Sequence, residues 1–110
     1  MTEASLQRDP ILRQILERLV TELRPCRIYL FGSRARGEAS AESDYDLLLL
    51  VERPEEPLYR LSQRAYRVLR GIRASVDVLV WGRETFDSRL HLPASFPATV
   101  AGEGRLLHAA

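Results

Sequence analysis

The chain has 110 residues, a length that suits one domain with one hydrophobic core. Hydrophobic residues make up 45% and charged residues 28%, which is typical of a globular protein and excludes a disordered or fibrous chain. The chain has sixteen basic residues, all of them arginine, and fifteen acidic residues. The resulting formal charge of +1 gives no bulk attraction to nucleic acid or to an anionic membrane. We therefore expect one domain over residues 1–110, with any recognition of charge confined to local sites.

Cysteine content and apolar runs indicate the compartment. Cys26 is the single cysteine, so no internal disulfide can form, which suits a reducing cytoplasm. The longest apolar run, residues 47–51, is far shorter than the about 20 residues that span a bilayer. We therefore expect a cytoplasmic protein without a membrane segment, and we interpret Cys26 as a packing residue rather than a nucleophile.

The first predicted element is a helix over residues 10–24. Asp9 provides an acceptor for the helix N-cap, Pro10 suits the first turn, and Pro25 ends the helix. Apolar side chains recur at helical spacing on one half of the circumference. This pattern predicts a helix that packs one face against a sheet.

Three strands and a second helix are predicted farther along the chain. The runs 27–31 and 45–51 are rich in strand formers, and the second is apolar at both phases, so we expect it in the middle of the sheet with both faces covered. Residues 57–72 predict a helix and residues 75–81 a third strand. Residues 104–108 are compatible with a last strand.

Three aspartates stand where a structural role is difficult to supply. Asp44 and Asp46 are two residues apart at the start of the second strand, so both carboxylates project from one face of the sheet. Asp77 interrupts the apolar third strand, where a carboxylate requires a cation or several donors. Carboxylates side by side share a proton or bind a divalent cation, and oxygen ligands favour Mg²⁺. Each aspartate alone is also compatible with a turn, a cap or an arginine pair.

A glycine–serine turn follows the first strand. Gly32 allows the backbone to approach a phosphate closely, and Ser33 adds a hydroxyl donor at the start of a helical turn, where free N–H groups attract anions. Arg34 and Arg36 add positive charge, and we expect at least one of them within reach of a phosphate. An ordinary strand-to-helix connection is the alternative. The segment is not a P-loop, because the chain has no G-x-x-x-x-G-K-[ST] pattern.

These residues together resemble the signature of the minimal nucleotidyltransferases, a family of the DNA polymerase β-like superfamily. The resemblance covers about residues 10–108 and rests on three segments, Gly32-Ser-Arg-Ala-Arg-Gly37, Ser43-Asp-Tyr-Asp-Leu47 and Asp77. It implies an α/β fold of the two-layer α+β kind, in which a small mixed sheet packs against helices. The implied reaction moves a nucleoside monophosphate from an NTP, with ATP expected, to a hydroxyl group with the aid of two Mg²⁺ ions.

The resemblance also implies roles for single residues. The family's metal-binding and catalytic carboxylates correspond to Asp44, Asp46 and Asp77. Its nucleotide-binding turn corresponds to Gly32 and Ser33, and the arginine that follows corresponds to Arg36. All these positions agree with the family pattern, so we expect them to form one site.

The length of the chain bears on the acceptor of this reaction. Larger members of the superfamily carry a further helical domain that holds the acceptor, and 110 residues leave no room for one. The resemblance therefore implies a separate HEPN-domain toxin as partner, a hetero-oligomer, and an antitoxin that adenylylates the toxin. Because the net charge is only +1, we expect no direct binding of nucleic acid. The alternatives are a small-molecule acceptor, as in antibiotic-modifying members, and a non-catalytic antitoxin that acts by contact alone.

Two groups of side chains are compatible with either packing or binding. The first is an arginine row on the second helix, for which a solvated face is the default interpretation: Arg60, Arg64 and Arg67. The second consists of apolar residues set among prolines, which could cover the sheet or contact a partner: Leu90, Leu92 and Phe96.

Overall fold

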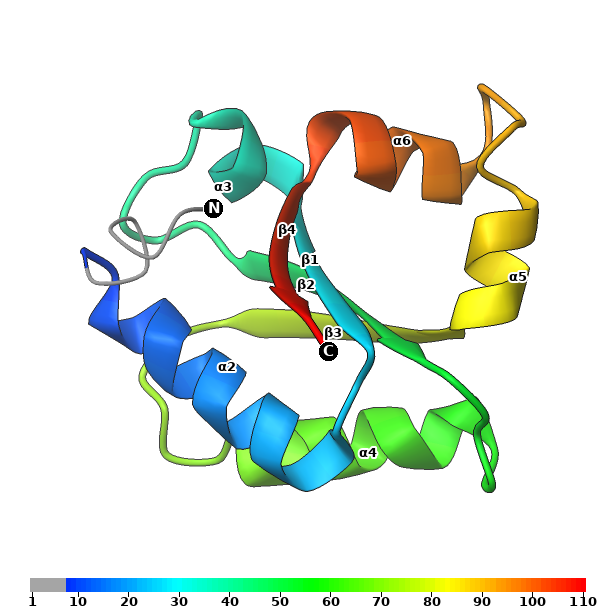
Figure 1. Cartoon of the computed structure of the whole chain (residues 1–110). Coiled ribbons are helices and arrows are strands. Elements are labelled where there is room, and N and C mark those ends of the chain that lie inside the picture. Colours follow the sequence, from blue (N-terminus) through cyan, green and yellow to red (C-terminus); the bar gives the residue numbers. More distant parts are fainter. Residues whose placement is uncertain (1–7) are drawn as a thin grey trace.

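A computed structural model describes residues 8–110, so the prediction of one domain over residues 1–110 includes residues 1–7, which lie outside the described part. The described residues form a four-stranded sheet in the order β3-β2-β1-β4 (Figure 1). Its strands are β1 (Arg27–Phe31), β2 (Tyr45–Val51), β3 (Val76–Gly82) and β4 (Arg105–Ala109). β1 is antiparallel to β2 and β4, whereas β2 is parallel to β3. The sheet is therefore mixed, as expected, and β2 lies inside it.

One face of the sheet is covered by α2 (Pro10–Leu23) and α4 (Leu58–Val68), the two helices predicted from the sequence (Figure 1). The buried face of α2 packs against every second residue of β2, namely Leu47, Leu49 and Val51. The predicted cap of α2 is confirmed, because the Asp9 carboxylate accepts a hydrogen bond from the backbone N–H of Leu12 at 3.0 Å. The same carboxylate accepts a hydrogen bond from the Tyr45 hydroxyl, and this contact joins the start of α2 to β2.

The other face is covered by α5 (Arg83–Ser88) and α6 (Phe96–Glu103), which the sequence did not predict. Leu48 and Leu50 of β2 pack against them and are buried. The Phe96 ring lies 5.5 Å from the Phe31 ring and 5.6 Å from the Trp81 ring, so Phe96 covers the sheet. Two neighbouring leucines of the tail remain exposed, Leu90 and Leu92. Helices therefore cover both faces of the sheet.

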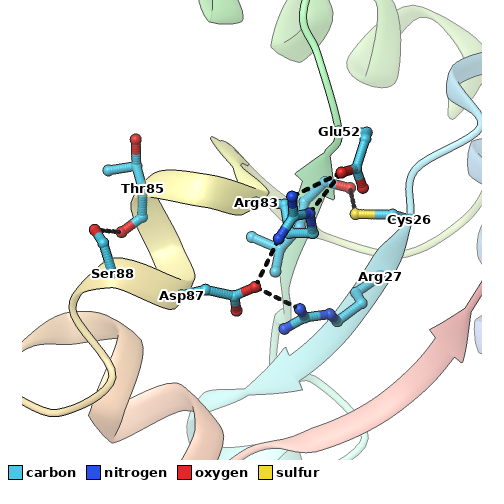
Figure 2. Close-up of polar contacts among 8 residues, drawn as sticks. Cys26, Arg27, Glu52, Arg83, Thr85, Asp87 and Ser88 are labelled. Carbon is cyan, nitrogen blue, oxygen red and sulfur yellow. Dashed lines mark hydrogen bonds and ion pairs between the residues drawn. The ribbon is translucent and has the colours of Figure 1, made fainter.

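Charged side chains form a network of ion pairs at the end of the sheet where β2 and β3 finish (Figure 2). Arg83 pairs with Glu52 at 2.8 Å and with Asp87 at 3.1 Å, and Arg27 pairs with Asp87 at 2.8 Å. Cys26 lies beside them, where burial and Glu52 raise the pKa of its thiol. A raised pKa keeps the thiol protonated, which agrees with a packing role.

Within residues 8–110, no helix combines the length and the apolar character needed to cross a membrane.

Candidate active site

Two of the predicted site residues, Asp46 and Asp77, lie side by side. They are register partners on the parallel strands β2 and β3, so their side chains project from the same face of the sheet. It is the face of α5 and α6, because Leu48 and Leu50, at the same phase as Asp46, pack there. Burial raises the pKa of Asp46, and the charges of Asp77 and Asp44 raise it further, as does a hydrogen bond with Asp77. The site is therefore electronegative, with like charges in close proximity.

The turn after β1 approaches Asp46 through its glycine. Gly32 has a φ of +73°, in the left-handed region, and a Cβ placed on it would overlap Oδ2 of Asp46. Phe31, the residue before it, is the register partner of Asp46 across the β1–β2 ladder. A glycine is therefore required here for two reasons, the backbone conformation and the space that the carboxylate occupies.

Ser33 lies in the first turn of α3 (Gly32–Arg36), a short helix that begins where β1 ends. No side chain of the described residues caps the N-terminus of α3. Because Gly32 touches Asp46, the first turn of α3, with its N–H groups and the Ser33 hydroxyl, lies next to the carboxylate pair. This arrangement brings the predicted phosphate-binding turn and two predicted metal ligands together.

The two arginines of α3 have different surroundings. Arg34 donates to the backbone carbonyl of Ser43 at 3.0 and 2.8 Å, and its guanidinium lies 3.9 Å from the centre of the Tyr45 ring. It therefore holds the loop that leads to Asp44, a positioning role that the sequence analysis did not assign. Arg36 is exposed, pairs only weakly with the solvent-exposed Glu38 at 3.2 Å, and faces the site closely enough to oppose the rise in the Asp46 pKa.

Asp44 stands apart from the close pair. It is exposed in the loop before β2, and its charge acts on Asp46 after that of Asp77. In the described part of the chain, no group of three or more His, Cys, Asp and Glu side chains is arranged to hold a metal ion. The fit to a divalent cation therefore rests on Asp46 and Asp77, two adjacent carboxylates whose mutual repulsion a cation would relieve.

The carboxylate pair is open to solvent on one side. Asp77 itself is exposed. A substrate bound at these carboxylates would therefore need a further surface to close over it.

The carboxylate pair lies on adjacent strands of a small mixed sheet, next to the glycine–serine turn that follows β1. Residues 12–96 match the model of the nucleotidyltransferase domain family, and the chain belongs to this family. The fold and the transferase class that the resemblance implied are thereby confirmed. A search of curated proteins gave no match.

Several solved structures share this fold. A protein of Sulfolobus solfataricus described as a nucleotidyltransferase is 27% identical, with a TM-score of 0.56 over 72% of this chain and 70% of that chain. A toxin–antitoxin solved with AMP-PNP is 23% identical, with a TM-score of 0.55 over 89% and 73%. The toxin–antitoxin MntA-HpeT, solved as a mutant with a tyrosine replaced by alanine, is 22% identical, with a TM-score of 0.56 over 90% and 72%.

Proposed function

We propose that this nucleotidyltransferase transfers AMP from ATP to a hydroxyl group of a HEPN-domain toxin and thereby acts as its antitoxin in the cytoplasm. The observation that carries the proposal is the close approach of Gly32 to Asp46, which is itself paired with Asp77, because it supports a phosphate-binding turn next to a cation-binding pair. Two structural neighbours described as toxin–antitoxins, one of them solved with AMP-PNP, support the context and the nucleotide. The near-neutral net charge favours a protein acceptor over nucleic acid.

In this proposal the three aspartates hold Mg²⁺, with two ions expected. Bound Mg²⁺ supplies the charge that neutralises the phosphates and the attacking and leaving oxygens of an in-line displacement. Asp46 lies between Gly32 and Asp77 and would be a ligand for both ions. Asp44, in the loop before β2, would be the third ligand. Another MntA-HpeT structure is a mutant in which two aspartates, two positions apart, are replaced by glutamate, and Asp44 and Asp46 have this spacing.

The other predicted residues would bind the triphosphate. Gly32 lets the backbone approach, Ser33 would donate its hydroxyl and an N–H group, and Arg36 would pair with a phosphate oxygen in place of Glu38. Asp77, on the strand farther from this turn, would accept the proton of the acceptor hydroxyl. The bond from the α-phosphorus to the bridging oxygen breaks as the new phosphate ester forms, and pyrophosphate leaves.

A labelling experiment tests the proposal. The chain is co-expressed and purified with a HEPN-domain toxin, and both are incubated with Mg²⁺ and ATP labelled at the α-phosphate. We expect label and one AMP mass on the toxin with the wild-type chain, and no label with Asp77→Asn. Asp87→Asn, an aspartate of the charged network at the other end of the sheet, is the control that should keep activity.

The two alternatives give different results in the same experiment. An antitoxin that acts by contact would inhibit the toxin equally well as wild type and as Asp77→Asn, with label on neither protein. A small-molecule transferase would leave both proteins unlabelled and the toxin active, while consuming ATP when an aminoglycoside is added. Either result contradicts the proposed function.

A further inference from the structure

We infer that the acceptor protein docks along the free edge of β3, with an apolar side chain over Leu79 and in the cavity beside Trp81. This inference rests on the proposed function, because it takes a protein hydroxyl as the acceptor. Beyond the proposed function, it specifies the surface of this chain that the acceptor binds and the chemistry of the acceptor segment that fits this surface. Three observations carry it: the order of the site residues across the sheet, the exposure of Leu79, and a cavity farther along β3.

The order of the site residues fixes the side from which the acceptor arrives. Gly32 belongs to the β1 end, Asp46 to β2 and Asp77 to β3, and β3 is an edge strand of the described sheet. In an in-line displacement the attacking hydroxyl lies opposite the leaving pyrophosphate. If the triphosphate lies on the Gly32 turn, the hydroxyl must come from the β3 side. No further strand occupies that side among the described residues.

Leu79 is the exposed apolar residue on that side. It lies two residues after Asp77, on the same strand and the same face, and its register partner Leu48 is fully buried. Leu79 itself is 43% exposed, because α5 lies at the end of β3 and α6 packs on β1 and β4 (Figure 1). Burial of the exposed Leu79 side chain removes apolar surface from water, which would favour binding of an apolar side chain of the partner.

A cavity of about 260 Å³ lies farther along β3, at the end of the strand. It is lined by Leu58, Val80, Trp81, Gly82, Thr85 and Arg89. Its lining is largely apolar, and the guanidinium of Arg89 lies 5.6 Å from the Trp81 ring at the rim. A buried apolar or aromatic anchor with an acidic residue nearby matches this combination, which is common at protein interfaces.

The spacing along β3 describes the partner segment. Asp77 and Trp81 are four residues apart, which at about 3.3 Å per strand residue corresponds to about 13 Å. The backbone N–H of Val78 already donates to the Tyr66 hydroxyl at 3.0 Å, so this part of the edge is not available for pairing with an added strand. The partner therefore binds through side chains, and presents a hydroxyl and an apolar anchor about 13 Å apart.

The test compares variants of three leucines in the complex with the HEPN-domain protein. We expect Leu79→Asp and Leu58→Asp to weaken binding of the toxin at least tenfold in calorimetry without nucleotide, and to raise the KM for the toxin. Both should bind ATP as the wild type does. Leu106→Asp is the control, because Leu106 is also 43% exposed but lies on β4, at the opposite edge of the sheet. Melting temperatures establish that each variant folds, and Leu79→Ser repeats the test with a milder change.

The possible results separate this inference from the proposed function. If the wild type labels the toxin, and Leu79→Asp and Leu58→Asp bind and label it equally well, the docking surface is wrong and the function stands. If Leu79→Asp loses ATP affinity as well, Leu79 belongs to the nucleotide site and the inference fails. If the wild type self-associates and Leu79→Asp is monomeric without the toxin, the surface pairs two copies of this chain, which also overturns it. If the wild type labels nothing, the proposed function fails first.

Discussion

Gly32 connects the backbone of one strand to the carboxylate of the next. Its φ of +73° is costly for any residue with a Cβ, and the Asp46 carboxylate fills the space where a Cβ would be. Gly37, five residues later, has nearly the same φ, +75°, but no atom lies within 4 Å of its Cβ position. A substitution at Gly37 therefore tests the backbone conformation alone, whereas one at Gly32 also displaces Asp46.

We predict that Gly32→Ala and Gly37→Ala each lower the free energy of unfolding by about 1–2 kcal/mol, the cost of a left-handed alanine. Only Gly32→Ala should also abolish transfer, because its methyl group displaces the Asp46 carboxylate. Urea unfolding and a transfer assay measure the two effects. A Gly32→Ala enzyme with normal activity would show that Asp46 need not occupy its observed position.

Asp46 is expected to lower stability while it supports function. Its pKa is raised in the folded protein by burial and by Asp77 and Asp44, so the folded state is penalised as pH rises through that raised pKa. We predict that Asp46→Asn raises the melting temperature at pH 7 and abolishes transfer. The difference from the wild type should shrink as pH falls below the raised pKa, and Mg²⁺ should stabilise the wild type more than the variant. A variant that melts below the wild type at pH 7 would contradict this.

At the scale of elements, the loop between α3 and β2 is held by Arg34 rather than by regular structure. Two hydrogen bonds to the Ser43 carbonyl and the contact with the Tyr45 ring fix the segment that carries Asp44. The sequence placed Arg34 and Arg36 in one positive patch, since residues two apart in a short helix cannot be assigned to different surroundings from spacing alone. The structure separates a loop-holding arginine from a solvent-facing one.

We predict different effects for the two arginines. Arg34→Ala should lower the free energy of unfolding by about 1–3 kcal/mol, because hydrogen bonds from a charged donor are lost. Arg36→Ala should leave stability unchanged and raise the KM for ATP about tenfold, the loss of one charged contact with a phosphate. Thermal unfolding and steady-state kinetics distinguish the two. Equal effects on KM would show that both arginines bind the nucleotide.

The network at the far end of the sheet offers a pH test. The hydrogen bond from Arg27 holds the pKa of Asp87 below its usual range, with Arg83 adding to the effect. A lowered pKa contributes stability that is present above the unfolded pKa and is lost as pH falls through the folded one. Asp87→Asn should therefore cost about 1–2 kcal/mol at pH 7 and progressively less below about pH 4. A loss that is independent of pH would assign the effect to packing.

Long amphipathic or strongly apolar segments were predictable, and the short helices α5 and α6 were not. The strands 27–31 and 45–51 have the predicted bounds, and the helix starting at Pro10 has its predicted cap. α5 and α6 contain six and eight residues, too few for a helical period to appear. Ser95, which caps α6 through the N–H of Ala98, with Pro97 in the first turn, was the available signal.

At the scale of the whole molecule, the fold divides stability and function between the faces and ends of one sheet. α2 and α4 form the larger core on one face, while the carboxylate pair lies on the other face, at the end where β2 and β3 begin. The spacing of Asp44 and Asp46 predicted a shared face, but only the parallel pairing of β2 with β3 brings Asp77 to Asp46. β2 ends at Val51 and β3 begins at Val76, so the pairing is a long-range contact that no local sequence pattern predicts.

The central claim is that Asp46 and Asp77 hold a divalent cation against the Gly32 turn. A crystal of the chain grown with Mn²⁺ and AMP-PNP tests this most directly, since manganese is located by its anomalous scattering. We predict an anomalous peak between the Asp46 and Asp77 carboxylates, with the phosphates on the first turn of α3. A bound nucleotide with no manganese between these two carboxylates would contradict the claim.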